Sequence, residues 1–123
     1  MSYRKGYKAE LELVHLLSKR GFLAIRSPRS GRIGLPAPDV IAIRRGKILA
    51  FECKFIGRAF KVPSSELEQL KQWERIGGAE CYIAWKYPRR GWRFISLKHV
   101  LKRRGNLRKV DWSSGKTLDE LTA

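Results

Sequence analysis

The stretch DVIAIRRGKILAFECKF, residues 39–55, decides the fold. Two runs rich in aliphatic and aromatic residues, Asp39–Ile43 and Ile48–Phe55, flank the short polar segment Arg44–Lys47. That segment contains Gly46, a residue typical of tight turns. The pattern predicts two adjacent strands joined as a β-hairpin.

The segments on either side of the hairpin complete an α/β pattern. Helical spacing of apolar residues, turn residues and two capping signals, a Ser65–Glu68 capping box and Ser96, mark the elements. We expect a helix over Tyr3–Arg20, a strand over Phe22–Arg26, a loop over 27–38, a helix over 65–76, strands over Cys81–Lys86 and Trp92–Leu97, and a short helix to Lys102. The tail from Val110 is expected to be irregular, with a last turn over Thr117–Leu121. This order predicts one α/β domain, residues 1–123, with a mixed central sheet of about five strands flanked by helices.

Composition restricts the class of protein. The chain has 123 residues, which suits one domain. Lys and Arg total 27 against 11 Asp and Glu, and a net charge of +16 indicates a polyanionic partner, most simply nucleic acid. No apolar run approaches the ~18 residues of a membrane span, and the two cysteines form no CxxC motif. We therefore expect a cytoplasmic protein with no membrane partner.

The acidic residues are unevenly distributed. Between Glu12 and Glu66 the only carboxylates are Asp39 and Glu52, one on each strand of the predicted hairpin. The tight turn makes these two strands neighbours in space. Residues two apart on a strand share a face, so Glu52 and Lys54 project from the same side.

Two interpretations of these charges are open. In the first, Asp39 begins a strand, and Glu52 and Lys54 form a solvated or paired edge. In the second, the two carboxylates supply hard oxygen ligands for Mg²⁺, with the Cys53 backbone carbonyl as a third ligand. Lys54 would then orient an attacking water and help to deprotonate it.

Glu10 bears on this choice. It lies at helical spacing from Leu13, Val14 and Leu17, and therefore on or beside the apolar stripe that packs against the sheet. A carboxylate there requires a partner, and a metal ion shared with the hairpin acids would be one. The alternative is a favourable interaction with the N-terminal end of the helix dipole.

The motif Pro38-Asp39, twelve residues, then Glu52-Cys53-Lys54 resembles the PD-(D/E)xK nuclease signature. Other motifs resemble archaeal-type Holliday junction resolvases from residue 3 to about 97: Tyr3-Arg4-Lys5-Gly6 with Ala9-Glu10, Gly21-Phe22 through Ile25-Arg26-Ser27, Ser64 through Trp73, and Gly91-Trp92-Arg93-Phe94. The resemblance implies a restriction-endonuclease-like fold and a Mg²⁺-dependent, structure-selective endonuclease, with Mn²⁺ as a substitute ion. It also implies a homodimer that makes paired symmetric nicks in four-way DNA junctions and takes no small-molecule substrate.

The resemblance also implies roles for individual residues. Glu10, Asp39 and Glu52 would be the metal-site acids, Lys54 the catalytic lysine, Arg26 the essential arginine and Ser30 a loop serine that contributes to cleavage. The chain departs from the family at Leu11, where an arginine is usual. Either a neighbouring base such as Lys8 or Arg29 replaces it, or phosphate binding there is weaker.

Basic residues flank the proposed site, and the segment 86–109 is rich in Lys and Arg and contains no acid. Any one of these residues is expected simply as a basic side chain on a solvated surface. Together they fit phosphate contacts that position DNA without reading its sequence. The expected DNA-binding residues are Arg4, Lys5, Arg29, Arg32, Arg58, Lys61, Arg89 and Arg90. Two rival functions share these features: a repair or restriction-like PD-(D/E)xK endonuclease acting on other DNA structures, and a non-catalytic architectural DNA-binding protein.

Overall fold

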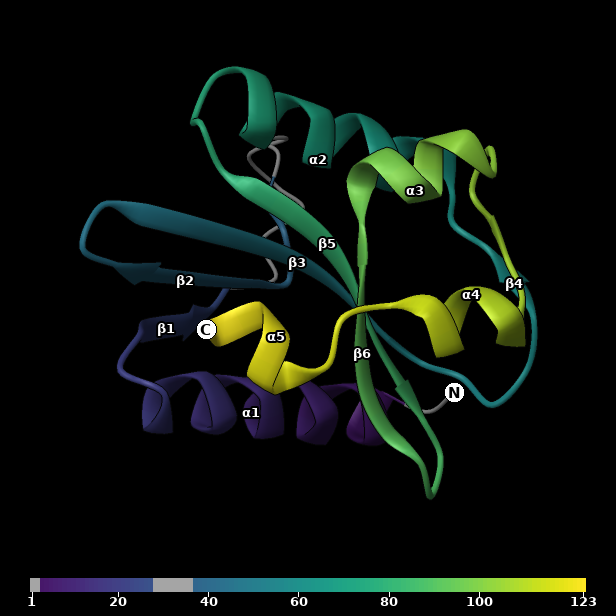
Figure 1. Cartoon of the computed structure of the whole chain (residues 1–123), viewed down its shortest axis with the longest axis horizontal. Coiled ribbons are helices and arrows are strands. Elements are labelled where there is room, and N and C mark those ends of the chain that lie inside the picture. The colour runs from purple at the N-terminus through teal and green to yellow at the C-terminus, as the bar shows by residue number, and fades with distance from the viewer. Residues whose placement is uncertain (1–2, 28–36) are drawn as a thin grey trace.

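The computed structural model describes residues 3–27 and 37–123, with side chains from residue 6 onward (Figure 1). The elements in chain order are α1 (Tyr3–Lys19), β1 (Leu23–Arg26), β2 (Val40–Arg44), β3 (Lys47–Phe55), β4 (Phe60–Lys61), α2 (Ser64–Arg75), β5 (Glu80–Tyr87), β6 (Gly91–Ser96), α3 (Leu97–Lys102), β7 (Asn106–Leu107), α4 (Lys109–Ser114) and α5 (Leu118–Thr122).

Five of the strands form one mixed sheet in the order β1-β2-β3-β5-β6. Only β3 and β5 are parallel within it, and the other neighbours are antiparallel. The predicted hairpin is β2–β3, and the predicted α/β architecture with a five-stranded mixed sheet is confirmed. No helix in the described ranges is long and apolar enough to span a membrane.

Helices cover both faces of the sheet (Figure 1). Leu13 and Leu17 of α1 pack with Leu121 of α5 against one face, which we call the α1 face. Residues of α2, α3 and α4 pack against the opposite face, the α2 face. Successive residues of a strand point to opposite faces, so β3 sends Leu49 to the α1 face and Ala50 to the α2 face.

The sequence of α1 explains its position. Ala9, Leu13 and Leu17 recur every four residues and are buried. Gly21, at φ +87°, ends the helix region in the left-handed conformation, and the Phe22 N–H donates to the Leu17 carbonyl at 3.2 Å. This packing fixes the rotation of α1 about its axis and determines where its other side chains lie.

The predicted capping box of the second helix is wrong. The helix begins at Ser64, after an extended Pro63, and has no side-chain cap. Ser65 therefore lies inside the first turn, and Glu68 pairs with Lys71 at 3.0 Å. The predicted cap of the following short helix is present, because Ser96 accepts a hydrogen bond from the His99 N–H.

The C-terminal region is more ordered than the sequence predicts. The predicted last turn over Thr117–Leu121 is present as α5, but α4 forms where the tail was expected to be irregular, and β7 pairs with β4 in a two-stranded ribbon. The helices have only six and five residues, too few for a periodic pattern to appear. Local caps hold them, as in α5, where Thr117 and Glu120 exchange hydrogen bonds.

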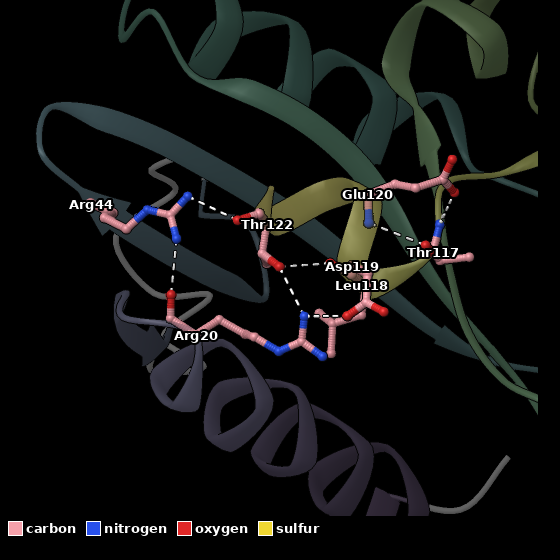
Figure 2. A network of polar contacts seen from close by, with 7 residues as sticks. All are labelled: Arg20, Arg44, Thr117, Leu118, Asp119, Glu120 and Thr122. Carbon is pink, nitrogen blue, oxygen red and sulfur yellow. Dashed lines mark hydrogen bonds and ion pairs between the residues drawn. The ribbon is translucent and has the colours of Figure 1, made fainter.

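Two arginines fasten α5 to the rest of the fold (Figure 2). Arg20 donates to Asp119 Oδ1 at 2.5 Å and to Thr122 Oγ1 at 3.1 Å. Arg44 donates to the carbonyls of Thr122 at 3.0 Å and Arg20 at 2.9 Å. Charged donors on carbonyl groups make strong hydrogen bonds, so these contacts hold α5 against α1 and β2.

Candidate active site

The hairpin places two acids opposite each other. Asp39 immediately precedes the Val40–Phe51 pair of the β2–β3 register, so it stands across from Glu52. The Cys53 backbone N–H donates to Asp39 Oδ2 at 2.8 Å, which fixes that carboxylate. Glu52 is 4% exposed. Burial above all, and then the nearby Asp39 and Glu66, raise the pKa of Glu52 to about 9.

A pocket of about 420 Å³ opens where Asp39 and Glu52 face each other across β2 and β3. It brings together six residues that the sequence singles out: Glu10, Asp39, Glu52, Cys53, Lys54 and Arg58. It is also lined by Glu66 and Pro88, which no sequence motif assigned to the site. Residues from α1, the hairpin, α2 and the β5–β6 turn therefore meet in one cavity.

Glu10 and Arg26 form one half of the site. Glu10 is buried on α1, and its Oε1 accepts from Arg26 Nε at 2.7 Å. Arg26 ends β1 beside the start of β2, because it pairs with Val40, and its guanidinium lies 4.3 Å from the centre of the Tyr7 ring. The buried acid thus has a charged partner, and the arginine lies on the strand next to β2. Arg26 itself is not among the residues that line the pocket.

Lys54 and Glu66 form the other half. Lys54 Nζ lies 2.7 Å from Glu66 Oε1, and both side chains are largely buried, at 18% and 26% exposed. Sequence reasoning missed Glu66. Carboxylates are favoured in the first turn of a helix, and this preference could have pointed to Glu66. It did not, because the predicted cap at Ser65 placed the helix start too late, whereas α2 begins at Ser64.

The other predicted site residues lie at the rim or outside the described residues. Ser30, Arg29 and Arg32 lie outside them, as do the side chains of Arg4 and Lys5. Lys61 is exposed on β4, and Arg89 and Arg90 are exposed at the β5–β6 turn that contributes Pro88 to the pocket. Leu11 is half-buried, and Lys8 near it is exposed.

The donor set suits a hard divalent cation. Asp39 and Glu52 face each other, and the Cys53 backbone borders the same pocket. Among the described side chains, no three of the His, Cys, Asp and Glu groups are arranged to enclose a metal ion. Mg²⁺ does not require such a cage, because it is usually bound by one or two carboxylates and keeps several waters. Asp39 and Glu52 therefore fit Mg²⁺. One oxygen of Glu10 accepts from Arg26, and a role for Glu10 as a third metal-site acid stays a prediction.

The class of protein follows from this arrangement. Opposed acids on a hairpin, a lysine two residues after the second acid and a mixed α/β sheet are the features expected of a PD-(D/E)xK nuclease. A family model described as archaeal Holliday junction resolvase (Hjc) matches residues 1–122. The chain belongs to this family and is an endodeoxyribonuclease of that type.

Individual relatives agree with this assignment. The crossover junction endodeoxyribonuclease Hjc of Archaeoglobus fulgidus is 38% identical over 110 residues, which are 89% of this chain and 80% of the relative. That of Methanocaldococcus jannaschii is 40% identical over 86 residues, 69% of this chain and 61% of the relative. The solved structure of A. fulgidus Hjc, a Holliday junction resolvase, superposes with a TM-score of 0.87 at 31% identity, covering 96% of this chain and all of that one.

Proposed function

We propose that this protein resolves four-way DNA junctions by Mg²⁺-dependent hydrolysis of the phosphodiester backbone, as paired symmetric nicks. Mn²⁺ would substitute for Mg²⁺. The observation that carries the proposal is the meeting of Asp39, Glu52 and Lys54 in one pocket, in a chain of the resolvase family. An intracellular location and the absence of a small-molecule substrate remain predictions.

Each residue has a distinct task in this mechanism. Asp39 and Glu52 would hold the ion, with the Cys53 carbonyl as a further ligand. When bound, Mg²⁺ would polarise the scissile phosphate and lower the pKa of an attacking water. Lys54 lines the same pocket, and its ammonium group, held by Glu66, would hydrogen-bond the water or a phosphate oxygen there. Arg26, which is held by Glu10, would stabilise negative charge on the substrate.

The proposal is tested with a labelled synthetic four-way junction and an excess of linear duplex as competitor. We expect paired nicks at symmetric positions with Mg²⁺ and none with EDTA. Preferential cutting of flaps, nicks or linear duplex would show a nuclease with another substrate. Tight junction binding without metal-dependent cutting would show an architectural protein.

We further propose that the enzyme acts as a homodimer through an uncovered part of the α2 face. Leu23 and Ile43 face each other across β1 and β2 and are 80% and 42% exposed, and Ile25 beside them is 62% exposed. Exposed apolar side chains that gather on one sheet face mark an interaction site. A second copy is the occupant that suits a two-fold symmetric junction, because an isologous interface presents two equivalent active sites.

The dimer is tested by light scattering on a sizing column. We expect the wild type at twice the mass of one chain and Ile25→Lys at the mass of one chain, because a lysine placed in an apolar interface remains unpaired. Val110→Lys is the matched control, since Val110 is 59% exposed on α4 and lies outside the patch. A monomeric wild type, or dissociation of both variants, contradicts the proposal.

A further inference from the structure

The ribbon of β4 and β7 is a feature that the sequence did not predict. Phe60 pairs with Leu107, and Lys61 pairs with Asn106. Phe60 packs against Trp85 with ring centroids 4.8 Å apart, and Leu107 is buried beside it. Because side chains alternate along a strand, Lys61 and Asn106 point outward. The ribbon therefore has a buried apolar face and an exposed polar face.

The turn before β7 is tightly built. The Val62 N–H donates to the Gly105 carbonyl at 2.8 Å, and a Cβ on Gly105 would lie 2.9 Å from the Val62 carbonyl oxygen. Only glycine permits this approach, and its φ of +83° also favours glycine. Arg104 precedes it at φ +53°, a conformation that arginine rarely adopts. A long basic side chain is thus held at the tip of a rigid turn.

Six exposed basic residues lie along this ribbon and the segments that enter and leave it. We call them the ribbon ridge: Arg58, Lys61, Lys102, Arg104, Arg108 and Lys109. The segments 53–65 and 96–110 contain no acidic residue. The ridge therefore has a dense positive charge with no carboxylate in its own segments to offset it.

The nearest acid along the chain, Asp111, is already engaged inside the fold. It is buried, lies 2.8 Å from His99 Nε2 and 3.3 Å from Arg103 Nε, and accepts from the Arg108 N–H at 2.8 Å. Burial alone would raise its pKa, but these partners hold the pKa of Asp111 below its usual value. Its charge anchors the base of the ridge and is not available at the surface.

The ridge is continuous with the active-site pocket. Arg58 lines the pocket, and it is three residues from Lys61 on β4, at most about 10 Å of extended chain. The pairing of β4 with β7 places Lys61 opposite Asn106, and Arg104 and Arg108 lie two residues to either side of Asn106 along the chain. In Figure 1, β4, β7 and α4 lie together at one end of the molecule, away from the β2–β3 turn.

We propose that the ribbon ridge binds the phosphate backbone of one duplex arm of the junction, beyond the nucleotides in the pocket. This inference rests on the proposed function, since it assumes that the pocket receives junction DNA. The ridge offers charged donors on a rigid scaffold, which suits contacts that fix the orientation of a duplex without reading its sequence. It would set the angle at which an arm leaves the active site.

The test compares two double variants that remove the same charge. Arg104→Gln with Arg108→Gln changes the ridge. Lys19→Gln with Arg45→Gln is the matched control. Both residues are exposed, Lys19 at the C-terminal end of α1 and Arg45 in the β2–β3 turn, and these segments lie away from β4 in Figure 1. Arg45, at φ +49°, precedes a glycine in a turn, as Arg104 does. Each double variant therefore replaces one arginine whose backbone is in the left-handed conformation.

Binding is measured by fluorescence anisotropy in EDTA with two four-way junctions. The arms of one are about 20 base pairs long, or two turns of the double helix, and those of the other are about 8 base pairs long, or less than one turn. For long arms we expect the ridge variant to bind about tenfold more weakly, and its salt slope to fall by about 0.9 for each phosphate that it no longer neutralises. The control variant should bind like the wild type. For short arms, all three proteins should bind alike.

Equal losses in the two variants, or a ridge variant that binds long arms like the wild type, would overturn the proposal for the ridge. A loss that is the same for short and long arms would also overturn it, because the affected phosphates would then lie at the junction centre. If the wild type itself shows no preference for junctions over linear duplex, it is the proposed function that fails.

Discussion

Glu52→Gln is expected to slow junction cleavage by about 10³-fold while junction binding stays intact. The amide keeps the shape of the side chain but removes the charge that would hold a divalent cation opposite Asp39. The fold should tolerate the change. With a pKa of about 9, Glu52 is protonated at neutral pH when no cation is bound, and glutamine closely resembles that neutral form.

Single-turnover cleavage in Mg²⁺ and gel-shift binding in EDTA would separate the two effects. Asp39→Asn should show a loss of similar size, because it removes the second carboxylate of the pair. Glu68→Gln is the control, since Glu68 is exposed on α2 and outside the pocket lining. If Glu52→Gln cuts at the wild-type rate, or binding falls in parallel with cleavage, the metal-site assignment is incorrect.

Lys54→Ala is expected to slow cleavage by about 10²-fold, and Glu66→Gln by about tenfold, or about 1.4 kcal/mol in the barrier. Glu66 does not need to touch DNA to have this effect. Its carboxylate holds the Lys54 ammonium at 2.7 Å, and without it the flexible lysine would sample other positions in the pocket. The loss should therefore fall on the rate of cleavage and not on the affinity for the junction.

A double-mutant cycle tests this assignment of Glu66 as a positioning residue. The Lys54→Ala/Glu66→Gln enzyme should cleave as fast as Lys54→Ala alone, because Glu66 acts only through the lysine. Glu68→Gln serves again as the control, since its pair with Lys71 lies on the exposed surface of the same helix. Additive losses would show that Glu66 acts on the substrate or the ion directly, and full activity of Glu66→Gln would show that it has no role.

The sequence predicted those parts of the site that depend on neighbouring residues. The hairpin and the opposition of Asp39 and Glu52 follow from one turn and the alternation of side chains. The burial of Glu10 follows from its place beside the apolar stripe of α1. In each case a local pattern fixes which way a side chain points.

What the sequence did not reveal depends on contacts between distant segments. Glu66 enters the site because α2 packs over the end of β3 and begins at Ser64, two residues earlier than a cap at Ser65 would place its first residue. The β4–β7 ribbon joins two-residue strands more than forty positions apart, too short to leave a pattern. Short elements of this kind exist because the rest of the fold supports them.

The topology of the central sheet also sets the order in which the site can assemble. The β2–β3 hairpin closes a short loop, so its formation costs little chain entropy. The parallel pairing of β3 with β5 must wait for the whole segment between them, which includes α2. We therefore expect the two acids to meet during folding before Glu66 pairs with Lys54, and the docking of α2 and β5 to complete the pocket later.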